Sequence, residues 1–210
     1  MVCTPHRELT SSEITDANNE NDIFGGTRIS EPTATYNCHS YAWYRYSTSN
    51  PYWIMDISQF LNDDDCTYIL SPSDIQAKDI IVYCDNDGMV LHSGVVQSVS
   101  SSGELTICSK WGQAGVYEHS VVNVPWGYYA DYSSGSIRYV ILRYHDYTNL
   151  YTGDEYHSGS QHYFRYADIC DICGKETNES WISIDCMGPP CYVPWSLGIV
   201  VSHNKYTYKL

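Results

Sequence analysis

Apolar residues between positions 79 and 144 come in short runs separated by turn residues, which is the pattern of an antiparallel sheet. Strands are predicted over residues 79–83, 89–99 and 104–109. The intervening residues 85–88 (DNDG) and 101–103 (SSG) are typical of hairpin turns. Two further strands are predicted, a strong one over residues 137–144 and a weaker one over residues 121–124.

Helical patterns come before these strands. Residues 38–46 contain no Gly or Pro and are rich in aromatic side chains, so a helix is predicted to begin at or near Cys38. Shorter helices are predicted near residues 12–18 and over residues 56–61. A helix followed by an antiparallel sheet indicates an α+β domain.

The composition divides the chain into three regions. Residues 1–35 are polar and predict a loosely structured lead-in without chemistry, and residues 36–150 carry the main domain. Residues 151–210 are rich in Cys, His and Tyr and poor in aliphatic side chains before Leu197, so we expect a small appendage there. No internal repeat is visible.

The charge excludes one class of partner. At a formal charge of −14, nucleic acids and anionic membranes are not expected to bind, because both are recognised by clustered Lys and Arg. The 21 Tyr against 3 Phe are typical of extracellular β-rich proteins. No apolar stretch is long enough to span a bilayer, and the opening residues lack the apolar core of a signal peptide. If the protein is exported, its leader has already been removed.

Nine cysteines are many for a chain of 210 residues, and four of them fall in the last quarter. These four, Cys170, Cys173, Cys186 and Cys191, predict either a zinc site or two disulfides, and we favour structural zinc slightly. The Cys-x-x-Cys-Gly pattern is typical of a zinc knuckle, although the second pair is spaced more widely than usual. Either arrangement would staple a region that has too few aliphatic residues to hold itself together.

Cys38 and His92 form the pair with the clearest chemistry. A thiol attacks a carbonyl group only as the thiolate, which a helix N-terminus or a nearby imidazole stabilises. Cys38 stands at the predicted helix start, and His92 lies in mid-strand, where Gly94 would leave room for a substrate. His39 follows Cys38 directly, and as the next helical residue it is expected to point away.

The segments 36–44 (YNCHSYAWY) and 78–96 (KDIIVYCDNDGMVLHSGVV) resemble the signature of the NlpC/P60 and CHAP hydrolases. That signature has a Cys that opens a helix, then a Gly-Asp strand, a turn, and a strand with His-x-Gly. The resemblance covers residues 36–111 and departs at Lys78, where these families usually have Gly, and at His39-Ser40, where they have Ser-Gly or Thr. It implies a papain-like fold with Cys38 as nucleophile and His92 as base.

Further roles follow from the same resemblance. The residue that orients the base comes from the strand after the His strand, which makes Ser109 the first choice and Lys110 the second. Trp111 would then be a platform for the substrate. Tyr36 could add a hydroxyl to the oxyanion site beside the backbone N–H of Cys38, or could equally be a core aromatic.

These observations together predict a secreted or cell-wall-associated bacterial cysteine peptidase or amidase. Its substrate would be a peptidoglycan stem peptide or another extracellular peptide, and its catalysis would need no metal. A monomer is expected. Two alternatives remain open: an acyltransferase that uses the same two residues, and a binding module in which Cys38 is inert.

Overall fold

The computed structural model describes residues 3–4, 6–21, 24–44, 52–62, 65–125 and 138–185. The chain divides into two compact units, Met1–Tyr144 and His145–Leu210. The division falls slightly before residue 150, where the change in composition predicts a boundary. Within the described residues no helix has the length and hydrophobicity to cross a membrane.

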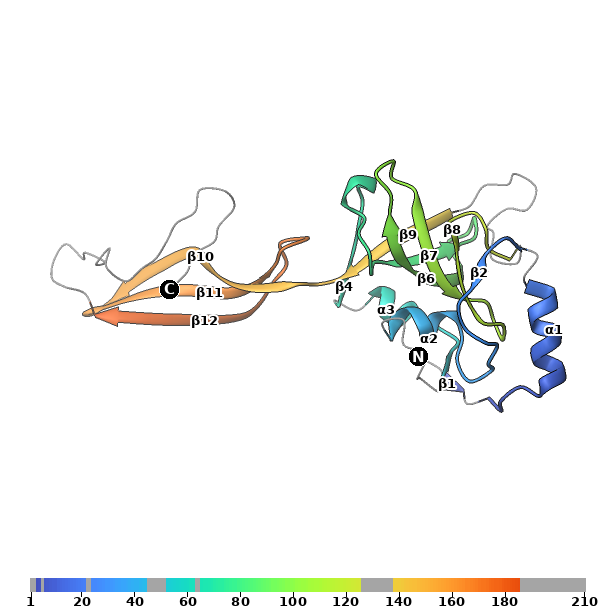
Figure 1. Ribbon diagram of the computed structural model, residues 1–210. Helices are drawn as coiled ribbons and strands as arrows, with labels where there is room; N and C mark the ends of the chain where they lie inside the picture. The colour runs from blue at the N-terminus through green and yellow to red at the C-terminus, as the bar shows by residue number, and fades with distance from the viewer. Residues whose placement is uncertain are drawn as a thin grey trace. The chain divides into compact units, whose positions relative to one another are not determined.

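An antiparallel seven-stranded sheet forms the centre of the first unit (Figure 1). In their order across the sheet, the strands are β2 (Thr27–Arg28), β8 (Val116–Ser120), β7 (Leu105–Lys110), β6 (Val90–Val99), β5 (Ile80–Cys84), β9 (Arg138–Tyr144) and β4 (Cys66–Tyr68). All pairings between neighbouring strands are antiparallel. The predicted strands at 79–83, 89–99, 104–109 and 137–144 are confirmed with small shifts at their ends. The prediction for residues 121–124 is wrong, because the chain turns there and Asn123 N–H donates to the Ser120 carbonyl.

In its described residues, the first unit also contains three α-helices and a small two-stranded sheet. The helices are α1 (Ser11–Asn21), α2 (Cys38–Trp43) and α3 (Ser58–Asn62), and a 3-10 turn, η2, covers Pro72–Asp74. Strand β1 (Cys3–Thr4) pairs with β3 (Trp53–Ile54). The region predicted as a loose lead-in supplies strands β1 and β2 beside helix α1, which confirms the helix predicted near residues 12–18. The two strands are a correction: with two residues each, they are too short to show a hydrophobic period.

The side-chain period of the strands separates two apolar clusters. Ile80, Val82 and Val95 point to the same cluster as Tyr41 and Trp43 of helix α2. The alternate residues of the strands belong to the second cluster, whose buried members are Ile81, Tyr83, Val96, Leu105, Ile107, Val124 and Ile141. Helix α2 is thus packed on one face of the sheet. Because successive side chains of a strand point to opposite faces, a strand that is buried on both faces contributes to both clusters.

In the part that the structure describes, residues 145–185, the second unit forms a three-stranded antiparallel sheet in the order β10-β11-β12. Its strands are β10 (Tyr147–Ser158), β11 (Gln161–Cys170) and β12 (Glu176–Asp185). No strands were predicted here, because Tyr, Thr and His occupy positions where aliphatic residues usually mark a strand. Overall the described chain is mostly β, with antiparallel sheets and few helices, which agrees with the α+β class in its coarse form.

Candidate functional site

Asn37 determines where the helix of Cys38 begins. As the N-cap residue of α2, Asn37 accepts a hydrogen bond from Ser40 N–H through Oδ1 (3.1 Å). The same oxygen accepts from Ile54 N–H (3.2 Å), and the amide nitrogen donates to the Ile54 carbonyl (2.8 Å). One buried side chain therefore starts the helix and ties it to β3. Cys38 is the first residue of α2, as predicted, and is 7% exposed.

Two imidazoles surround the Cys38 sulfur. Burial raises the pKa of the thiol, but charge interactions and hydrogen bonds with His39 and His92 outweigh it and hold the pKa well below its ordinary value. Helix α2 has only six residues, so its dipole is a minor partner beside two histidines. Cys38 and His92, which lie far apart in the sequence, are brought together by the fold.

His39 points toward the sulfur, against the expectation that it would turn away. Its Nδ1 shares a hydrogen bond of 2.9 Å with the Ser93 hydroxyl of β6. Burial by itself would lower the pKa of His39. The charge of Cys38 and its hydrogen bond raise this pKa by more, so it lies above its ordinary value. Successive helical residues differ by about 100° around the helix axis. Because α2 lies directly on the sheet, Cys38 and His39 can both face β6 at the start of this helix.

His92 is fully buried in β6 and pairs with Tyr83 of β5. The centroids of the two rings lie 5.6 Å apart. The Gly94 beside it has a different role from the predicted one. A Cβ at this position would lie 2.8 Å from Ser109 Cβ and 2.9 Å from the Cys108 carbonyl oxygen, so Gly94 makes room for strand β7 rather than for a substrate.

Ser109 is bonded to a different histidine from the one expected. Its hydroxyl hydrogen-bonds to His119 Nε2 (2.7 Å) and accepts from Trp111 Nε1–H (3.0 Å). Ser109 was predicted to orient His92. In the structure, its hydrogen bond instead joins β7 to His119 of the neighbouring strand β8. The reason is strand order: β8 lies beside β7 on the side away from β6, and it brings His119 to Ser109.

Lys110, the second choice for that role, is also buried. Its ammonium donates to the carbonyls of Thr33 (2.7 Å), Gly112 (2.7 Å) and Ala114 (2.6 Å). Burial lowers the pKa of Lys110 to about 7, opposed by the charges of Cys38 and Glu8. All three acceptors are carbonyl groups, so Lys110 organises the loops around β7 and does not accept a bond from an imidazole.

The two predicted substrate contacts belong to the core. Trp111 is 2% exposed and stacks on Tyr117 with the ring centroids 3.9 Å apart, so it cannot serve as an open platform. Tyr36 is also 2% exposed, and its hydroxyl hydrogen-bonds to the side chain of Ser30. The alternative of a core aromatic therefore applies to Tyr36. In both cases the aromatic pattern of the sequence reflects packing against β7 and β8.

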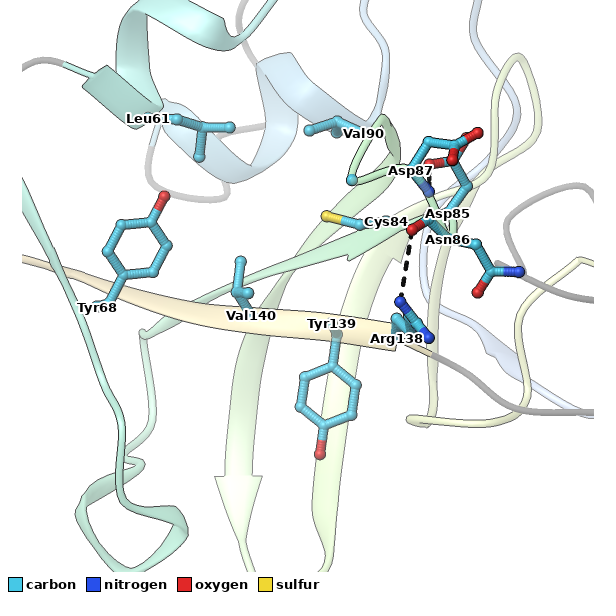
Figure 2. Close-up of a pocket in the computed structure, with 11 residues that line it drawn as sticks. Leu61, Tyr68, Cys84, Asp85, Asn86, Asp87, Val90, Arg138, Tyr139 and Val140 are labelled. Atoms are coloured by element: carbon cyan, nitrogen blue, oxygen red, sulfur yellow. Dashed lines mark hydrogen bonds between the residues drawn. The ribbon is translucent and has the colours of Figure 1, made fainter.

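An open pocket of about 710 Å³ lies at the turn of the β5–β6 hairpin (Figure 2). Its walls include Cys84, Val90 and the turn at residues 85–88, and Arg138 donates to the Asn86 carbonyl at its rim (3.5 Å). None of Cys38, His39 and His92 is among its lining residues.

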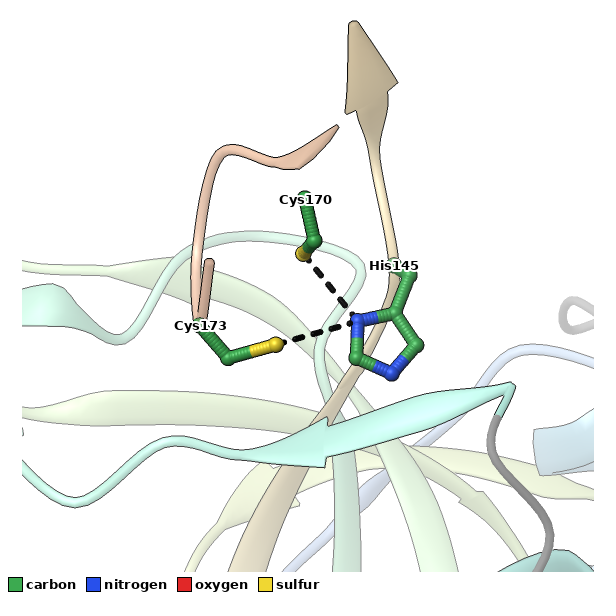
Figure 3. A group of neighbouring side chains, drawn as sticks. All are labelled: His145, Cys170 and Cys173. Atoms are coloured by element: carbon green, nitrogen blue, oxygen red, sulfur yellow. Dashed lines mark hydrogen bonds between the residues drawn. The ribbon is translucent and has the colours of Figure 1, made fainter. Parts of the chain in front are cut away.

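A second cluster of reactive side chains lies in the second unit (Figure 3). His145, Cys170 and Cys173 place one nitrogen and two sulfur atoms within 4.8 Å of one another, a group that could hold a metal ion. Two of the four predicted ligands are thus together, while Cys186 and Cys191 lie outside the described residues. His145 was missed because its distance in sequence from the Cys-x-x-Cys pair follows no ligand spacing, and only the β10–β11 pairing brings it there.

Comparisons of the chain with protein-family models, with curated proteins and with solved structures gave no match.

Proposed function

We propose that the first unit is a thiol hydrolase of papain-like type that cleaves amide bonds through Cys38, with His92 as its base. The observation that supports this most directly is the lowered pKa of Cys38 between the imidazoles of His39 and His92. A structural cysteine buried in apolar surroundings has a raised pKa and is inert. Cys108 of the same sheet shows that behaviour, since burial and the Glu118 charge raise its pKa to about 11.

The conformation of Lys78 supports the resemblance to NlpC/P60 and CHAP enzymes. Lys78 has a φ of 79°, in the left-handed region that favours glycine. It stands where those families usually have Gly, and its N–H donates to the Val96 carbonyl (2.7 Å). A position whose backbone favours glycine therefore stands where those families usually have one.

The proposed reaction has two steps. The Cys38 thiolate attacks the carbonyl carbon, the C–N bond breaks, and the His92 imidazolium gives its proton to the departing amine. Water then attacks the thioester while the neutral His92 takes a proton from it, and the thiolate leaves as the carboxylic acid is released. The backbone N–H of Cys38 is the proposed oxyanion donor. No metal takes part in these steps.

The substrate we propose is a peptide of the bacterial cell wall, a peptidoglycan stem peptide, met outside the cell or at the wall. The charge of −14 agrees with a substrate that is not a polyanion. Transfer of the acyl group to an amine would use the same thioester. It is distinguished by adding an amine and measuring the amide product against the free acid.

Alkylation of the purified chain by iodoacetamide tests the proposal. Peptide mapping should find Cys38 modified at pH 6 far faster than Cys108, a matched control because both are buried in the same unit. Mapping is needed because Cys170, whose pKa is lowered to about 7, will also react. His92→Gln should slow the labelling of Cys38 at pH 6.

The outcome that contradicts the proposal is equally specific. A Cys38 that reacts only as pH approaches the range of ordinary thiols, about 8.5, would indicate an inert binding module. If Cys38 is reactive, release of new amino groups from peptidoglycan should depend on it, and Cys38→Ala should abolish that release.

A further inference from the structure

The turn between β11 and β12 presents two sulfur atoms in the manner of a metal knuckle. Cys170 ends β11 and Cys173 lies in the turn that follows, and the Cys170 sulfur accepts a hydrogen bond from Ile172 N–H (3.4 Å). The Cys173 N–H also bonds to that sulfur. Gly174 follows with a φ of 74° and donates its N–H to the Cys170 carbonyl (2.9 Å). Amides that face a sulfur stabilise it as a thiolate, the form that metals bind.

His145 completes the group from the other side. It precedes β10, and its Nδ1 lies 3.0 Å from the Cys170 sulfur and 3.5 Å from the Cys173 sulfur. A tetrahedral zinc ion with Zn–S of about 2.3 Å and Zn–N of about 2.0 Å would place such atoms about 3.6 Å apart. The separation of 3.5 Å from Cys173 is close to that value and the separation of 3.0 Å from Cys170 is shorter, so a zinc ion fits once the side chains of His145 and Cys170 move slightly apart.

The position of the group gives the metal a structural task. The Tyr147–Cys170 pair lies at the start of β10 and the end of β11, and Asp171 N–H donates to the Asp146 carbonyl (3.0 Å). An ion held by all three ligands would join the segment before β10, the end of β11 and the turn into β12. Among the described residues, the buried hydrophobic side chains of this unit are few: Leu150, Phe164, Tyr166, Ala167 and Cys170. A small sheet of this kind commonly depends on a metal or another cross-link.

We infer that His145, Cys170 and Cys173 bind a zinc ion that holds together this end of the three-stranded sheet. Two thiolates and one imidazole suit zinc better than magnesium or calcium, which prefer oxygen ligands. Binding displaces the thiol protons to the buffer and involves no redox step. Cys186 and Cys191 were also predicted as zinc ligands from the sequence, and the same measurements can test them. The site is independent of Cys38, so either proposal can fail without the other.

Metal analysis of the full-length chain, purified under reducing conditions with zinc in the growth medium, tests the site. One zinc ion per chain is expected. His145→Ala, Cys170→Ser and Cys173→Ser should each lose most of it, whereas His145→Cys should keep it because a thiolate replaces the imidazole. The matched controls are His157→Ala, an exposed histidine in the same unit, and Cys84→Ser. Cys186→Ser and Cys191→Ser show whether either residue is a fourth ligand.

Two further measurements keep the test valid if a variant folds poorly. Cobalt substitution of the wild-type chain should give thiolate-to-cobalt absorption, which falls when one cysteine is removed. Chelation of zinc should speed hydrogen exchange at the amides of Ile172 and Cys173 and leave that of β5 and β6 unchanged. A reduced wild-type chain that binds no zinc, full zinc in His145→Ala, or a Cys170–Cys173 disulfide in the freshly isolated protein would overturn the inference.

Discussion

His119 makes the chain sensitive to acid in a way that can be measured. The ring is 4% exposed and lies in a directional network of hydrogen bonds. Trp111 donates to the Ser109 hydroxyl, Ser109 bonds to His119 Nε2 (2.7 Å), and His119 Nδ1 bonds to the Ser120 carbonyl (2.8 Å). A carbonyl only accepts, so Nδ1 carries the proton and Nε2 accepts from Ser109. The network is complete with a neutral ring, and a second proton would disturb it.

The magnitude follows from the shift of the pKa. Burial lowers the pKa of His119 from 6.5 to about 4, with the Ser120 bond opposing and the charge of His92 assisting. The unfolded chain therefore binds this proton at a higher pH than the folded one. Stability from neutral His119 is complete above pH 6.5 and is lost as the pH falls to about 4. At 1.36 kcal/mol for each pKa unit, the loss is about 2 kcal/mol by pH 5 and about 3 kcal/mol in full.

Urea unfolding of the wild type and of His119→Gln at pH 7.5 and pH 5 measures this loss. Glutamine keeps a donor and an acceptor but does not titrate. The variant should be less stable at pH 7.5, because its amide fits the network less well. On acidification, however, it should lose about 2 kcal/mol less than the wild type. Carboxylates titrate in both proteins and cancel in the comparison. Parallel losses of stability in the two proteins would refute the argument.

Substitutions at Gly94 and at Lys78 test the backbone around the site. Gly94→Ala should destabilise the chain by about 1–3 kcal/mol in urea and slow the alkylation of Cys38, because the added methyl group pushes β6 away from β7. Gly103→Ala is its control: with a φ of 87° and no atom within 4 Å, it should cost about 1–2 kcal/mol of strain and leave the labelling rate unchanged. Lys78→Gly should raise the urea midpoint, with a gain of up to about 1 kcal/mol from relief of its positive φ. An unchanged or lower midpoint would show that this φ carries no strain.

Local patterns in the sequence determined the elements that frame the thiol site. The alternation of apolar residues and the turns at 85–88 and 101–103 predicted β5, β6 and β7 closely, because both features depend on near neighbours in the chain. The absence of Gly and Pro after Asn37 predicted the start of α2 at Cys38. A resemblance in the order of motifs predicted that Cys38 and His92 would meet.

Tertiary structure alone decided which other side chains accompany them. The docking of α2 on β6 turned His39 toward the sulfur. The strand order β8-β7-β6 placed His119 where it hydrogen-bonds to Ser109. The pairing of β10 with β11 brought His145 to Cys170. Such contacts depend on which strands are neighbours and in what register. A local hydrophobic period carries no information on either, since one pattern is compatible with many orders of strands.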